Sequence, residues 1–254
     1  MSERTVAVTG SASGIGAALT NLLQKQGDRV IGVDLRDADV IADLSTHDGR
    51  LAAAAAVTSA AGGVLDGVVT CAGTSVPGEL MVRVNYFGTT DFVTALQPAL
   101  AASAAPRVAV VGSISATQQA DSDVVAACLA GDESLALEAA AVVISDRRAQ
   151  QLYPSSKSAL AQWARRTAIE PGWADAGIPL NVVAPGVVLT PMTEELIADP
   201  VMKEVMDAAV PMPLNGYLQA EDVAQVLAFL VSPENSHITG QVVFVDGGAE
   251  VTLR

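Results

Sequence analysis

The chain alternates between short apolar runs and longer segments in which apolar residues recur at helical spacing. One helical stripe contains Ile15, Leu19 and Leu23, and another contains Val223 and Leu227. The apolar runs are typical of strands buried on both faces of a parallel sheet, and they cover Thr5–Thr9, Arg29–Asp34, Val40–Ala42, Asp66–Thr70, Arg107–Val111, Leu180–Val183 and Gln241–Val245. The pattern predicts one α/β domain over residues 1–254, a Rossmann-type doubly wound sheet of about seven mainly parallel strands with helices on both faces.

Composition and charge narrow the class of partner. Half of the residues are hydrophobic and 17% are charged, which is typical of a globular protein. The formal net charge of -14 disfavours nucleic acid and anionic membrane surfaces as partners. The first strand follows a polar start with no signal peptide pattern, and no apolar stretch has the length of a membrane span. Two cysteines and two histidines lie isolated in the sequence, so we expect a cytoplasmic protein without a metal site.

A glycine-rich turn joins the first predicted strand to the first predicted helix. Its sequence is TGSASGIG at residues 9–16, with glycines at 10, 14 and 16. Such a turn lets the backbone approach a pyrophosphate and presents a helix N-terminus to it, although a glycine turn alone can also be purely structural. Asp34 ends the next strand, where a carboxylate can bind the adenosine ribose hydroxyls and would repel a 2′-phosphate. This position favours NAD over NADP, and the nearby Arg36 keeps NADP open as an alternative.

The stretch YPSSK places Tyr153 and Lys157 four residues apart, on one face of a helix. A free tyrosine titrates near ~10, which is too high for ready proton exchange at neutral pH. A neighbouring cation stabilises the phenolate, so we expect Lys157 to lower the pKa of Tyr153 and make it a usable acid and base. Pro154 suits the first turn of this helix. Taken alone, such a pair is more often a coincidence on a solvated surface.

Taken together, these motifs resemble the short-chain dehydrogenase/reductase family. TGSASGIG, YPSSK and the terminal ITGQVVFVDGG occur in the order of that family, and the resemblance covers essentially the full chain. VIGVDLRDADVIADLS, VNYFG and the CAG at 71–73 look most like its bacterial 3α-hydroxysteroid dehydrogenase/carbonyl reductase branch. The resemblance implies a single-domain oxidoreductase that uses a nicotinamide cofactor.

The resemblance also implies catalytic roles for four residues. Tyr153 would be the general acid and base, and Lys157 would hold the nicotinamide ribose. Ser113 would hydrogen-bond the substrate oxygen, and its place at the end of a strand favours it over the nearby Ser115. Asn85 would hold a helix kink and a water of the proton relay. A strand-end serine and a helix-capping asparagine are the structural alternatives.

The cofactor implied by the resemblance is NAD. Asp43 would face the adenine edge, and the family usually has Asn where this chain has Cys71, which we expect to be a small buried side chain. The implied cofactor-binding residues are Gly10, Ser13, Gly14, Ile15, Gly16, Asp34, Leu35, Asp43, Leu44, Cys71, Ala72, Gly73, Tyr153, Lys157, Pro185, Gly186, Val188 and Thr190.

Two segments depart from the family pattern. An insertion at about 118–150 separates Ser113 from Tyr153 by several times the usual gap, and it has helical character in Leu135–Ile144. We predict that it blocks a tetramer contact used in the family and leaves a homodimer; an extra lid without effect on assembly is the alternative. The segment between Gly73 and Asn85 is short, which would open the cleft.

A methionine-rich segment at about 190–218 follows Thr190. Methionines suit a mobile lid over an apolar ligand, and a helix packed on the core is the equal alternative. Few polar residues there could select a sugar or a charged substrate.

The sequence therefore predicts an NAD(H)-dependent oxidoreductase that interconverts an apolar secondary alcohol and its ketone, such as a steroid, a terpenoid or a xenobiotic carbonyl compound. The alternatives are a catalytically silent nicotinamide-binding sensor or scaffold, and a carbonyl reductase that prefers NADP. The four catalytic residues argue against the silent protein, and Asp34 argues against NADP.

Overall fold

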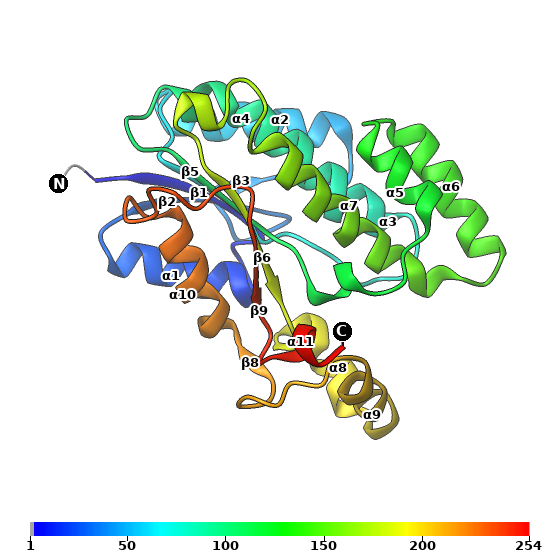
Figure 1. Cartoon of the computed structure of the whole chain (residues 1–254). Coiled ribbons are helices and arrows are strands. Elements are labelled where there is room, and N and C mark those ends of the chain that lie inside the picture. Colours follow the sequence, from blue (N-terminus) through cyan, green and yellow to red (C-terminus); the bar gives the residue numbers. More distant parts are fainter. Residues whose placement is uncertain (1–2, 254) are drawn as a thin grey trace.

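The computed structural model describes residues 3–253, and over this range seven parallel strands form one sheet (Figure 1). The strand order is β3-β2-β1-β4-β5-β6-β9, so the chain starts near the middle and winds outward in both directions. The strands are β1 (Thr5–Thr9), β2 (Arg29–Asp34), β3 (Val40–Ile41), β4 (Gly67–Thr70), β5 (Arg107–Val111), β6 (Leu180–Pro185) and β9 (Val242–Val245). The predicted doubly wound α/β sheet is confirmed.

The strand boundaries differ from the prediction by one residue at β3, β4 and β9, and β6 runs two residues further, to Pro185. A second, two-stranded sheet pairs β7 (Val188–Leu189) with β8 (Leu218–Gln219). The sequence pattern missed this pair because a two-residue strand is too short to show a repeat.

Helices cover both faces of the sheet (Figure 1). Side chains along β1 alternate between the two faces of the sheet, so they reach two helical layers. Val6 and Val8 pack with α1 (Gly14–Lys25) and α10 (Ala220–Val231) on one face. Ala7 belongs to the core on the opposite face. That opposite layer contains α2 (His47–Ala60), α4 (Gly88–Ala101) and α7 (Leu152–Thr167). Leu19, Leu23, Val223 and Leu227 of the two predicted helical stripes are buried, as the pattern requires.

The insertion forms a helical hairpin of α5 (Ser122–Leu129) and α6 (Glu133–Ser145) that lies beside α7 (Figure 1). Aspartates cap both helices: the Asp121 carboxylate accepts from Asp123 N and Val124 N, and the Asp132 carboxylate accepts from Leu135 N at 2.9 Å. The predicted helix over Leu135–Ile144 is confirmed.

The methionine-rich segment forms α8 (Pro191–Ala198) and α9 (Pro200–Ala209), which project beyond the carboxyl ends of the strands near α11 (Ala249–Leu253) (Figure 1). Ile197 and Met206 pack against a small cluster that includes Ile114. Between α2 and α4 the chain forms α3 (Leu80–Val82) and a π-helical turn over Arg83–Phe87. No helix within residues 3–253 is long and apolar enough to cross a membrane.

Candidate active site

A cleft of about 530 Å³ opens at the carboxyl ends of the parallel strands. The segments that follow β1, β2, β4, β5 and β6 contribute to its lining, together with α7 and the start of α8. Because parallel strands present their carboxyl ends at one edge, residues far apart in sequence meet here.

The glycine-rich turn forms one wall of the cleft with its backbone. Gly10 has a φ of +68°, and a Cβ there would come within 2.7 Å of Ala72 N. A Cβ on Gly16 would lie 2.1 Å from Gly10 O, so no larger residue fits at position 16. A Cβ on Gly14 would meet the Thr190 side chain at 3.3 Å. The turn thus exposes backbone and the N-terminus of α1 to the cleft, which fits a pyrophosphate.

Asp34 lies at the end of β2 and is held by the main chain. Its Oδ2 accepts from Ala12 N at 3.0 Å, and its Oδ1 accepts from Leu35 N at 2.7 Å. Further along the cleft, hydrogen bonds from the side chain and the backbone of Ser45 lower the pKa of Asp43. Two fixed carboxylates in this part of the cleft fit the hydroxyl and amino groups of an adenosine better than a phosphate.

Tyr153 and Ser113 meet at the other end of the cleft. Ser113 follows β5 and caps a 3₁₀ turn, where its Oγ accepts from Ser115 N at 3.1 Å. Ser113 lines the cleft, as does Tyr153 in the first turn of α7. Burial raises the pKa of Tyr153, and a hydrogen bond with the Ser113 side chain opposes this only in part. The prediction of a lowered phenol pKa is therefore wrong for the protein alone, since desolvation of the phenolate outweighs its partners.

Lys157 lies one helical turn after Tyr153 and is 4% exposed. Its Nζ donates to Val111 O at 2.9 Å and lies 5.8 Å from the centre of the Tyr153 ring. Burial lowers the pKa of this lysine to about 8. The ammonium is thus oriented by the end of β5 and remains mostly protonated at neutral pH.

Asn85 lies in the π-helical turn and is fully buried. Its Oδ1 accepts from Thr74 N at 2.8 Å, and its Nδ2 donates to Thr74 O at 3.0 Å and to Ser156 Oγ at 3.3 Å. The side chain therefore fastens the segment after β4 to α7. Thr74 lines the cleft, whereas Asn85 lies behind it.

The structure brings the sequence-predicted residues together in one cleft. Ser113 and all eighteen expected cofactor-binding residues line the cleft. Asn85 does not line it but hydrogen-bonds Thr74, which does. Burial raises the pKa of the Cys71 thiol to about 12, so it is an unreactive side chain. Sequence reasoning missed other lining residues, among them Leu80, Val84 and Thr193, because no motif or spacing marks them.

Comparison with known proteins identifies the family of the chain. A family model described as enoyl-(acyl carrier protein) reductase matches residues 10–250. The chain belongs to the short-chain dehydrogenase/reductase family, a family of oxidoreductases.

Individual relatives cover nearly the whole chain. The 3-alpha-hydroxysteroid dehydrogenase/carbonyl reductase of Comamonas testosteroni is 36% identical over 98% of this chain and 97% of its own. Momilactone A synthase of Oryza sativa subsp. japonica is 30% identical over 98% of this chain and 90% of its own. The crystal structure of the 3-alpha-hydroxysteroid dehydrogenase from Pseudomonas sp. B-0831 complexed with NADH has a TM-score of 0.91 and 44% identity, and it covers 98% of both chains.

Proposed function

We propose that the protein is an NAD(H)-dependent oxidoreductase that interconverts an apolar secondary alcohol and its ketone. The observation that carries the proposal is the meeting of Tyr153, Ser113 and Lys157 at one end of a cleft whose other end holds Asp34. The cofactor would lie along the cleft, with its pyrophosphate at the glycine-rich turn and its adenosine ribose on Asp34. When bound, the nicotinamide supplies or accepts the hydride.

Tyr153 would move the proton. In alcohol oxidation the phenolate takes the hydroxyl proton, and in ketone reduction the phenol gives it back. Ser113 would donate a hydrogen bond to the substrate oxygen, where negative charge develops. The Ser113–Tyr153 hydrogen bond supports this arrangement because one oxygen placed against both groups could receive both contacts.

Lys157 would bind the nicotinamide ribose through its ammonium, since only one donor is spent on Val111 O. Its charge, together with that of an oxidised nicotinamide, would oppose the desolvation that raises the pKa of Tyr153. Asn85 would act as a positioning residue, because its side chain holds Thr74 of the cleft lining. Its contact with Ser156 of α7 supports that role.

The preference for NAD rests on Asp34. Its carboxylate would bind the two ribose hydroxyls and repel a 2′-phosphate. The NADH complex of the Pseudomonas relative supports this preference. The family also contains NADP binders, such as the Pseudomonas aeruginosa RhlG/NADP complex at 26% identity, so cofactor choice depends on local residues.

The apolar substrate class rests on apolar side chains that line the cleft. Leu80, Val84 and Met192 contribute apolar surface there, and the names of the Comamonas and Pseudomonas relatives refer to hydroxysteroids. The segment at about 190–218 would act as the lid.

A panel of apolar secondary alcohols and ketones, assayed by nicotinamide absorbance with NAD and NADP in parallel, tests the proposal. Turnover of at least one apolar pair with a lower KM for NAD is expected. Turnover confined to sugars or charged substrates, or a lower KM for NADP, would contradict it.

We also propose a cytoplasmic homodimer. The α5–α6 hairpin packs beside α7, and the family resemblance implies that many tetramers of the family associate through the face that carries this helix. Solution scattering should give a dimer, and a stable tetramer packed through α7 would overturn this part of the proposal.

A further inference from the structure

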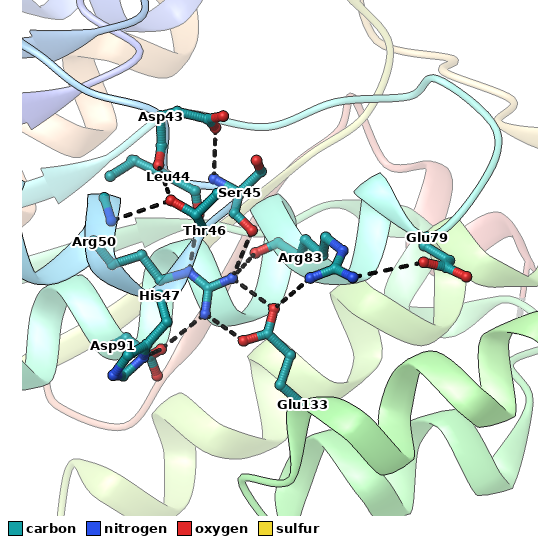
Figure 2. Close-up of polar contacts among 11 residues, drawn as sticks. Asp43, Leu44, Ser45, Thr46, His47, Arg50, Glu79, Arg83, Asp91 and Glu133 are labelled. Atoms are coloured by element: carbon teal, nitrogen blue, oxygen red, sulfur yellow. Dashed lines mark hydrogen bonds and ion pairs between the residues drawn. The ribbon is translucent and has the colours of Figure 1, made fainter.

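Arg50 on α2 is a fully buried cation, and its guanidinium is surrounded by hydrogen-bond acceptors (Figure 2). Its Nη1 and Nη2 bind the two carboxylate oxygens of Glu133 at 2.7 and 2.8 Å, and Nη1 also binds Asp91 at 3.0 Å. Its Nε and Nη2 donate to the carbonyls of Leu44 and Ser45 at 2.9 and 3.0 Å. A bidentate pair combined with carbonyl acceptors fixes a guanidinium in one orientation.

Two of the carbonyls that Arg50 binds, those of Leu44 and Ser45, belong to the segment Asp43–Ser45, which lines the cleft. Within this segment Ser45 N donates to Asp43 Oδ1 at 2.9 Å, so fixing the Ser45 backbone also fixes the Asp43 carboxylate. Figure 2 shows the segment on one side of the guanidinium and the two acidic partners on the other. Arg50 does not line the cleft itself and contacts the lining segment through this backbone.

Arg50 also contacts the π-helical turn that carries Asn85. Its Nη2 lies 3.4 Å from Arg83 O, and its Cζ lies 5.7 Å from the centre of the Phe87 ring. The turn and the cleft segment are close neighbours, since a Cβ on Gly88 would lie 3.1 Å from Leu44 O. One guanidinium therefore joins the segment after β3 to the turn before α4.

Glu133 is the part of this cluster that the insertion supplies. It is the first residue of α6, and its carboxylate also approaches Arg83 Nη1 at 3.4 Å. The hydrogen bond from Arg50 is the main cause that lowers the pKa of Glu133. A buried cation that loses one of its two carboxylates becomes costly, so the guanidinium would shift toward water and release the carbonyls.

We propose that Arg50 and Glu133 are positioning residues for the adenosine end of the cofactor site, and that the insertion is thereby a working part of that site. Arg50 holds the Asp43–Ser45 segment against the cleft, and Glu133 holds Arg50. This rests on the proposed function, in which the adenosine lies beside Asp34 and Asp43.

The test is the affinity for ADP, the adenosine half of the cofactor, measured by calorimetry on the full chain. Glu133→Gln keeps the size of the side chain and removes its charge, and we expect ADP to bind about tenfold more weakly. In steady-state assays the KM for NADH should rise by a similar factor while kcat at saturation stays unchanged. A general loss of structure would lower kcat as well.

Arg148→Gln is the matched control, because it breaks another ion pair of the insertion, Arg148 Nη1 to Asp121 Oδ2 at 2.7 Å, without touching the Asp43–Ser45 segment. It should leave ADP affinity unchanged. Glu133→Asp, which keeps the charge, should lie between wild type and Glu133→Gln, and it serves as the test if the glutamine variant does not fold.

Wild-type affinity for ADP in both Glu133 variants would overturn the inference and leave the proposed function intact. Equal weakening in Arg148→Gln would also overturn it. If the wild-type protein did not bind ADP at all, the proposed cofactor site itself would be wrong.

Discussion

The end of the cleft at the glycine-rich turn and the α8–α9 segment, which we propose as the lid, are built in opposite ways. Gly10, Gly16 and Asp34 present backbone and one main-chain-held carboxylate at the ends of buried strands. In α9, no residue is buried, and Val201 and Val205 are 69% and 54% exposed. A dinucleotide is a constant ligand that fixed backbone can recognise, whereas exposed apolar side chains can adapt to a variable substrate. The difference implies that changes in the two regions should affect separate kinetic constants.

Ser113 precedes Ile114, which packs with Ile197 and Met206 of α8 and α9, and loss of the Ser113 hydroxyl should lower turnover strongly. In Ser113→Ala we expect kcat to fall by about 10²–10³, because one donor to the developing oxyanion is lost. NADH affinity, measured by fluorescence titration, should stay unchanged.

Ser115→Ala is the matched control, since the contact from Ser115 to Ser113 is made by the backbone nitrogen. It should keep wild-type turnover. A larger loss in Ser115→Ala than in Ser113→Ala would assign the substrate contact to Ser115 instead.

Asp34→Asn tests whether this carboxylate sets the preference for NAD over NADP. The amide keeps the shape of the side chain but loses the charge that would bind ribose hydroxyls and repel a phosphate. We expect the ratio of kcat/KM for NAD over NADP to fall by about tenfold. The KM for the ketone should not change, and a shift in that constant would mean that the two ends are not separate.

The pH dependence of cofactor affinity tests the role of Lys157. Its pKa of about 8 means that the ammonium is present below that pH and is lost above it. If only the charged form binds the ribose, NADH affinity should fall by about tenfold between pH 7 and pH 9. Lys157→Met should bind weakly without this step, and an identical step in that variant would assign the titration to another group.

Substitution in the proposed lid should give the smallest effect, and it should change the KM for the substrate. Met192 lines the cleft and is 43% exposed, so Met192→Gln should raise the KM for an apolar ketone by about fivefold, or about 1 kcal/mol. Met202 lies in the same segment, is 38% exposed and does not line the cleft. Met202→Gln should therefore behave as wild type, and equal effects from both would refute a specific contact.

The sequence was most informative where chemistry depends on local pattern. The positions of three features could be predicted from local pattern: the glycine turn, Asp34 and the Tyr153–Lys157 pair. In each case a strand end or a helix face decides where the side chain lies. The sign of the Tyr153 pKa shift was mispredicted, since burial by distant segments is invisible in a five-residue motif.

The role of Arg50 could not be predicted from the sequence either. Its partners come from the segment after β3, the π-helical turn, α4 and α6, and no spacing connects them. Leu80 and Val84 likewise line the cleft, although no motif or spacing in the sequence marks them. Contacts between distant segments require the tertiary structure.

The proposed mechanism requires Tyr153 to exchange the substrate proton in an NAD(H)-dependent reaction. Tyr153→Phe removes only the hydroxyl, so its most direct test is turnover of an apolar alcohol or ketone by this variant, with NADH binding measured in the same preparation. A fall in kcat of about 10³ or more with unchanged NADH affinity is predicted. Near-normal turnover with the cofactor bound would contradict the mechanism.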